Sequence, residues 1–189
     1  MFDKYKTIYL DFDNTIVNTT EAICTLYNED FCYYKKFKPV DWCDIETWGF
    51  EECSCTTKEY INTYFNQPRF FEKVQFMYYA KETIEKLAQE YDIKIVSMGY
   101  KPNLRLKEEW IKKNLPGIDF IGVNLKKHKD KSHIDMSNGV LIDDNANMLT
   151  TSNAKCKICF GETYKWNEEW TGIRTINWVD VGKQLLHWR

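Results

Sequence analysis

Acidic residues that follow apolar runs are the side chains of this chain best suited to chemistry. Asp11 comes directly after the run TIYL and Asp13 lies two residues further on, while Asp143 and Asp144 come directly after GVLI. A carboxylate can act as a nucleophile, as a proton donor or as a ligand of a hard cation. An Asp-x-Asp pair by itself is about as often a simple turn, so the rest of the chain has to decide between a turn and a site.

Two further polar residues have positions of the same kind. Ser97 ends the run IKIVS and precedes Met98-Gly99, while Lys131 lies in the polar loop HKDKSH. Each also has a simpler interpretation, because Ser97 could cap the next helix and Lys131 could belong to a solvated run of charges. Lys129 remains an alternative to Lys131, since pattern cannot separate two lysines so close in one loop.

Apolar periodicity predicts the elements that must position these residues. We expect strands at about 7–11, 92–97, 120–123, 140–142, 157–160 and 174–176, and helices at about 19–31, 79–90, 103–114, 147–154 and 179 to His187. Thr19 or Thr20 is the expected N-cap of the first helix. Alternating strands and helices predict an α/β fold, a three-layer Rossmann-like arrangement with a mainly parallel sheet. The carboxyl ends of its strands meet at one edge, which would bring the polar residues together.

The segment from about Tyr33 to Pro68 differs from this alternation. Its apolar spacing is irregular and it is rich in aromatic residues and cysteines. It therefore predicts a small helical cap inserted after the first strand. The expected domains are an α/β core of residues 1–17 and 78–189 and a helical cap of residues 18–77.

Composition limits the classes of partner and compartment. The 189 residues carry a net charge of −2, which argues against binding of a nucleic acid polymer. No apolar stretch approaches the ~20 residues of a membrane span, and the N-terminus has no signal-peptide pattern, so we expect a cytoplasmic protein that does not bind membranes. The seven cysteines are then reduced thiols. Neither a Gly-x-Ser-x-Gly motif nor a glycine-rich P-loop is present, which argues against a serine hydrolase or a kinase.

Taken together, the polar strand ends indicate phosphoryl transfer. Asp11 would attack phosphorus, and Asp13 would protonate the leaving alkoxide and then activate water. A magnesium ion would separate the phosphate oxygens from the carboxylates. The residues expected to hold Mg²⁺ are Asp11, Asp13, Asp143 and Asp144, and those expected to bind phosphate are Ser97, Met98 and Lys131.

DFDNT, Ser97, Lys131 and IDD resemble, in order and spacing, the four motifs of the haloacid dehalogenase-like phosphohydrolases. Over nearly the whole chain, the order of features is similar to the 5′(3′)-deoxyribonucleotidase family. The resembling passages are PRFFEKV, LKEEWIKKNLPGIDF, DKS, VLIDD and RTINWVDV. This resemblance implies a magnesium-dependent nucleotidase whose cap closes over the base of a nucleoside monophosphate. Trp42, Trp48 and Tyr64 are candidates for stacking on that base, with the interior of the cap as their alternative place.

Three positions depart from the family pattern. Asn14 replaces a common glycine, although asparagine tolerates a left-handed turn. Ser97-Met98 stands where the family usually has Thr-Ser, and Asn145 stands where it often has arginine. Two alternatives to a nucleotidase stay open: a phosphatase of the same fold for another small phosphate ester, and a catalytically silent phosphate-binding module. A homodimer also stays open.

Overall fold

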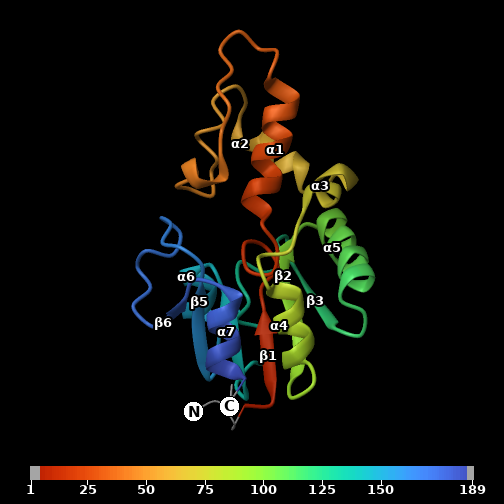
Figure 1. Ribbon diagram of the computed structural model, residues 1–189, viewed down its shortest axis with the longest axis vertical. Helices are drawn as coiled ribbons and strands as arrows, with labels where there is room; N and C mark the ends of the chain where they lie inside the picture. The colour runs from red at the N-terminus through yellow and green to blue at the C-terminus, as the bar shows by residue number, and fades with distance from the viewer. Residues whose placement is uncertain (1–4, 187–189) are drawn as a thin grey trace.

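The computed structural model describes residues 5–186, which form two lobes (Figure 1). The elements in chain order are β1 (Thr7–Leu10), α1 (Thr19–Phe31), the 3-10 helix η1 (Trp42–Asp44), α2 (Lys58–Tyr64), α3 (Pro68–Lys73), α4 (Ala80–Leu87), β2 (Asp92–Gly99), α5 (Lys101–Asn114), β3 (Asp119–Asn124), β4 (Gly139–Asp143), α6 (Ala146–Thr151), β5 (Cys156–Phe160), β6 (Ile173–Thr175) and α7 (Trp178–Leu185).

The strands of the described residues form one six-stranded sheet in the order β3-β2-β1-β4-β5-β6, and every pairing is parallel. In the register of the central strands, Leu10 lies opposite Ile95 on one side and Ile142 on the other. From β1 the chain runs outward to β3 and then returns to start the second half at β4. The connections after β1 and β4 therefore diverge and leave a crevice at the carboxyl edge. The predicted α/β fold class is confirmed.

Helices cover both faces of the sheet because successive strand residues point to opposite sides. Ile8 and Leu10 are buried in the same cluster as residues of α4, α5 and α7, whereas Tyr9 is buried with Leu149 of α6. Figure 1 shows α4 and α7 side by side on one face, in agreement with their contacts. The continuous burial along β1 thus reflects a sheet with two covered faces, which is the three-layer arrangement.

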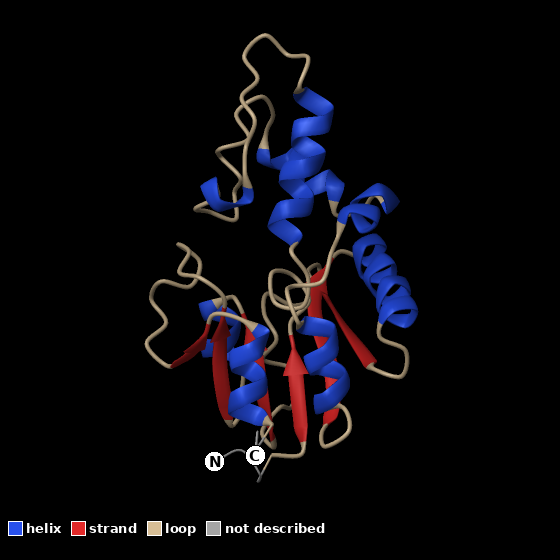
Figure 2. Cartoon of the chain, viewed as in Figure 1, coloured by secondary structure: helices blue, strands red, loops and turns tan. Residues whose placement is uncertain are grey.

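All strands lie in one lobe, and the other lobe contains only helices and loops (Figure 2). The helical lobe holds α1, η1, α2 and α3 and lies beyond the carboxyl edge of the sheet. Its insertion after β1 agrees with the sequence analysis. The predicted boundaries, 1–17 and 78–189 for the core and 18–77 for the cap, stay a prediction. The outermost residues of that core, 1–4 and 187–189, lie outside the described residues, as does the predicted helix end at His187.

One local prediction was wrong. The N-cap of α1 is Asn18, whose side chain accepts the N–H of Glu21 at 3.1 Å, and not Thr19 or Thr20. The two threonines are used elsewhere: Thr19 Oγ1 donates to Asp13, and the Thr20 amide donates to Asn14 Oδ1 at 3.0 Å. Within the part of the chain that the structure describes, no helix combines the length and apolarity that a membrane crossing requires.

Candidate active site

The end of β1 sets the position of the first carboxylate. The backbone amide of Asp11 donates to the carbonyl of Ile142 at 2.9 Å, so the ladder between β1 and β4 continues as far as Asp11. Beyond it the chain turns back at Asn14, which has a left-handed φ of 49°. The Asn14 side chain bonds to Thr20 at the start of α1. Asparagine therefore provides the turn that glycine often makes.

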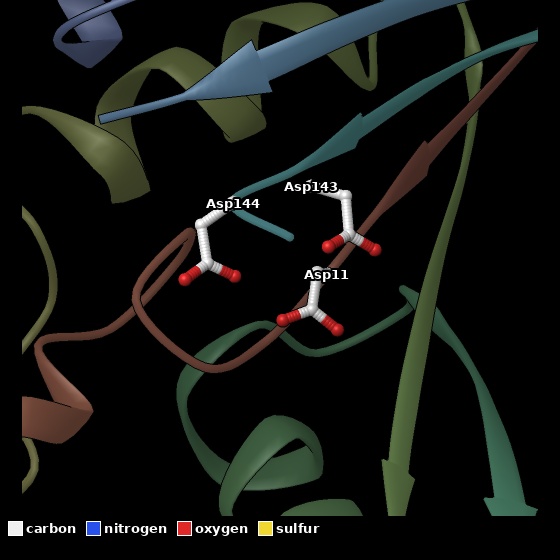
Figure 3. Close-up of side chains that lie close together, drawn as sticks. All are labelled: Asp11, Asp143 and Asp144. Carbon is white, nitrogen blue, oxygen red and sulfur yellow. The ribbon is translucent and has the colours of Figure 1, made fainter. Parts of the chain in front are cut away.

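Three buried carboxylates meet at this edge of the sheet. Asp11, Asp143 and Asp144 each offer one oxygen, and these oxygens lie within 4.8 Å of one another. Figure 3 shows the carboxylates of the three residues gathered at the ends of β1 and β4. The sequence analysis expected all three at a metal site, and the fold brings them together.

One lysine stands between two of them. Lys131 Nζ donates to Asp11 Oδ1 at 2.5 Å and to Asp143 Oδ2 at 2.6 Å, and its side chain is only 1% exposed. Lys129 and Lys131 both line the adjoining cavity, but the hydrogen bonds to the cluster come from Lys131. The structure thus separates the two lysines that the sequence could not.

The cluster carries more negative charge than its lysine balances. Burial raises the pKa of Asp11 to about 7, with Lys131 opposing the rise and Asp143 adding to it. Burial and then the charges of Asp11 and Asp143 hold the pKa of Asp144 well above its usual range. For Lys131, burial works against the charged form, but the two carboxylates raise its pKa overall. Three convergent oxygen donors with surplus negative charge fit a hard divalent cation such as Mg²⁺.

Asp13 lies beside this cluster and is not one of its three carboxylates. Its side chain accepts a hydrogen bond from Thr19 Oγ1 at 2.8 Å and forms a close ion pair with Lys107. Asp13 was expected both as a ligand and as an acid/base. Asp13 lines the cavity next to Asp11, and both expected roles stay predictions.

Lys107 is one of the site residues that the sequence analysis missed; Trp166 and Phe65, which also line the cavity, are others. Besides the pair with Asp13, its Nζ donates to Ser97 Oγ at 2.9 Å and to the Met98 carbonyl at 3.1 Å. A signal was available, because Lys107 lies four residues before the apolar Ile111 in the predicted helix; the structure indeed buries both. A lysine on the inward face of an amphipathic helix needs a buried partner.

Ser97 and Met98 lie at the end of β2 as expected, but they differ in exposure to the cavity. Met98 lines it, whereas the fully buried Ser97 hydroxyl is turned to Lys107. Ser97 does not cap the next helix, since the N-cap of α5 is Tyr100. A phosphate-binding role for these two residues stays a prediction.

A cavity of about 370 Å³ opens above the carboxylates, between the sheet and the cap. Its apolar walls include Trp48 and Phe65 of the cap, with ring centroids 6.0 Å apart, and Trp166 of the core, 5.8 Å from Trp48. Of the three aromatic candidates for base stacking, only Trp48 lines this cavity. Trp42 lies on η1 at a different surface hollow. Tyr64 is buried inside the cap, where its hydroxyl donates to Asp30 at 2.8 Å.

A parallel α/β sheet with an inserted cap, and strand-end aspartates beside a buried lysine, define a haloacid dehalogenase-like phosphohydrolase. Solved structures support the fold. The chain is similar to a HAD family hydrolase from Deinococcus radiodurans R1 with bound phosphate and sodium (TM-score 0.69, 14% identity, covering 98% of this chain and 96% of that one). It is also similar to a protein described as a predicted phosphatase from Clostridium acetobutylicum (TM-score 0.66, 14% identity, 97% and 99%). A third similar structure is a HAD-hydrolase from Bacillus subtilis bound to magnesium (TM-score 0.59, 14% identity, 97% and 99%).

The sequence of the chain establishes its family. Residues 5–189 match the family described as 5′ nucleotidase, deoxy (Pyrimidine), cytosolic type C protein, and the chain belongs to this family. A comparison with curated proteins finds no match. The chain is accordingly a phosphoric monoester hydrolase of the nucleotidase-like kind.

Proposed function

We propose that this protein is a magnesium-dependent nucleotidase that hydrolyses ribo- or deoxyribonucleoside monophosphates to nucleoside and phosphate through an aspartyl-phosphate. The observation that carries the proposal is the buried cluster of Asp11, Asp143 and Asp144 on the floor of a cavity whose roof is aromatic. The floor suits a phosphate held on a cation, and the roof suits a flat ring. The family match supports the same substrate class.

Asp11 is the proposed nucleophile. One of its carboxylate oxygens forms a bond to phosphorus while the bond from phosphorus to the nucleoside oxygen breaks. Asp11, Asp143 and Asp144 would hold Mg²⁺, which supplies positive charge between the phosphate oxygens and the attacking carboxylate. Lys131 holds Asp11 and Asp143 in place through its two short hydrogen bonds. Met98 and Lys131, which line the cavity, are the proposed phosphate contacts, and Ser97 would act through Lys107, whose ammonium donates to its hydroxyl.

Asp13 is the proposed acid and base. It would give its proton to the departing nucleoside oxygen in the first step. In the second step it would take a proton from water as the water oxygen attacks phosphorus and the bond to Asp11 breaks. Thr19 and Lys107 hold the Asp13 carboxylate from two sides, which fixes its direction for both transfers.

The aromatic residues on the cap side of the cavity form the proposed binding site of the base. Trp48 and Phe65 present apolar ring surface to the cavity, and stacking on aromatic side chains accepts any base. The family description names deoxy and pyrimidine compounds, which makes pyrimidine deoxyribonucleotides the first substrates to test. A cytoplasmic location also remains our proposal, and the family description, which names a cytosolic type, supports it.

The test is phosphate release from a panel of monophosphates with Mg²⁺, with Asp11→Asn as the blank. The panel contains ribo- and deoxyribonucleotides with each base, and sugar phosphates without a base. We expect turnover of nucleotides, none without Mg²⁺ and none in the variant. Good turnover of sugar phosphates with poor turnover of nucleotides would instead establish a phosphatase for another small ester. No turnover of any ester would support a phosphate-binding module.

A further inference from the structure

The connection between β5 and β6 joins the core to the cap. We call residues 162–168 of this connection the strap. The strap begins soon after the end of β5 and contacts the loop that follows η1 in the cap. The Lys165 amide donates to the Glu46 carbonyl at 3.3 Å, and the Lys165 ammonium pairs with the Glu46 carboxylate at 2.7 Å. Both side chains are exposed, so the ion pair contributes little to stability and can rearrange. The strap is therefore attached to the cap at Glu46.

Trp166, the next residue of the strap, faces both the cap and the carboxylates. Its indole lies edge-to-face against Trp48, at 5.8 Å and 75°, and stacks on Tyr164 at 4.3 Å and 4°. On its other side, Nε1–H donates to Asp144 Oδ2 at 2.8 Å. A single rigid ring thus contacts an aromatic residue of the cap and a carboxylate of the buried cluster.

Asp144 depends on the strap more than the other two carboxylates do. Lys131 pairs with Asp11 and Asp143, whereas among the described residues the hydrogen bond to the carboxylate of Asp144 comes from Trp166. The strap also holds the backbone of Asp144, because Asn167 Nδ2 donates to its carbonyl at 3.0 Å. The orientation of this carboxylate is therefore set by residues outside the strand that carries it.

We propose that Trp166 is a positioning residue that couples the placement of the cap to the orientation of Asp144. This inference rests on the proposed function, since it takes Asp144 as a ligand of Mg²⁺. One oxygen of Asp144 accepts from the indole, which leaves the other for the cation. Trp48 already packs against Trp166 in this structure, and a base held against Trp48 would keep this contact and hold the indole in its position. A nucleoside in the cavity should therefore strengthen Mg²⁺ binding, and Mg²⁺ should strengthen nucleoside binding by the same factor.

The first experiment measures Mg²⁺ affinity by isothermal titration calorimetry, without substrate. Trp166→Phe keeps an aromatic ring against Trp48 but removes the N–H donor. We expect its Kd for Mg²⁺ to rise about 10-fold, as is usual when a residue that orients a metal ligand is lost. Trp170→Phe is the matched control, because Trp170 lies further along the same connection and donates to the Ile173 carbonyl at 3.0 Å. The control should bind Mg²⁺ like the wild type; equal affinity in both variants and the wild type would overturn the positioning role.

The second experiment measures the coupling, as the ratio of Mg²⁺ affinities with and without saturating thymidine. We expect about a 5-fold ratio in the wild type, and a ratio near one in Trp166→Phe. Lys165→Gln changes only an exposed ion pair, so it keeps the proposal testable even if Trp166→Phe does not fold. It should reduce the ratio while leaving Mg²⁺ affinity without thymidine unchanged. An undiminished ratio in both variants, or a ratio of one in the wild type, would overturn the coupling.

These readouts separate the inference from the proposed function. Mg²⁺ affinity does not require turnover, so a protein whose Mg²⁺ affinity depends on Trp166 but that fails to hydrolyse nucleotides would refute only the substrate. Conversely, normal nucleotide hydrolysis with unchanged Mg²⁺ affinity in Trp166→Phe would refute only the inference.

Discussion

Replacing the proposed nucleophile should stabilise the metal-free protein while removing its activity. Asp11 is buried beside Asp143, and burial raises its pKa from 3.8 to about 7 even with Lys131 next to it. Each pH unit of such a difference is worth about 1.4 kcal/mol. Keeping Asp11 ionised in the fold at pH 8 therefore costs about 4 kcal/mol. The amide of the variant Asp11→Asn carries no charge, and its oxygen can still accept a hydrogen bond from Lys131.

The pH dependence of this cost follows from the two pKa values. Below about pH 4, Asp11 is protonated in both the folded and the unfolded chain, so the variant gains nothing. Between about pH 4 and 7 the unfolded chain loses the proton while the folded chain keeps it, and the wild type loses stability as the pH rises. Above that range both states are ionised, and the difference levels off. The stability gap between variant and wild type should thus grow by about 3 kcal/mol from pH 5 to pH 8.

The assay is urea unfolding in EDTA at pH 5, 6, 7 and 8, followed by circular dichroism. Asp119→Asn is the control, because its carboxylate is 70% exposed and should change stability little at any pH. Added Mg²⁺ should stabilise the wild type much more than Asp11→Asn. The difference in unfolding free energy between Asp11→Asn and the wild type should be present at pH 8 and should change with pH. If either expectation fails, ionised Asp11 does not destabilise the metal-free fold.

Three further changes test other parts of the site. Lys107→Met should lower kcat about 100- to 1000-fold with nucleotide substrates, because it removes the cation that holds Asp13; an unchanged kcat would exclude this role. Asn14→Ala should cost about 1–2 kcal/mol in urea unfolding, more than Asn14→Gly, since alanine is strained at a φ of 49°; equal losses would contradict the turn argument. Trp48→Ala should raise KM for nucleotides about 10-fold, from lost stacking, but not for a sugar phosphate, which has no base to stack. Tyr64→Phe, inside the cap, should leave both KM values unchanged.

Local sequence determined the elements and the strand-end chemistry. The apolar runs of β1, β2 and β4 are properties of a few consecutive residues, so the parallel sheet could be predicted. Asp11 and Asp143 follow their apolar runs directly, and strand ends of a parallel sheet share one edge. Their meeting was therefore predictable without any knowledge of side-chain packing.

Competition between neighbouring polar groups limited the local predictions. Thr19 and Thr20 have the side chains of an N-cap, but each bonds to the turn that follows β1, and Asn18 caps α1 instead. An N-cap prediction from residue type assumes that the side chain is free to bond to the first turn of its own helix. The tertiary turn at Asn14 decides which of several suitable oxygens is actually free.

The sequence by itself determined an α/β phosphohydrolase with Asp11, Asp143 and Asp144 at one edge of its sheet, because the strands and the position of each carboxylate at a strand end follow from short patterns. Only the tertiary structure decided that Lys131 stands between two carboxylates, that Lys107 reaches Asp13 and that Trp166 reaches Asp144. These contacts join residues that are 12 to 120 positions apart in the chain. Packing of helices, strap and cap fixes such distances, and no local periodicity encodes them.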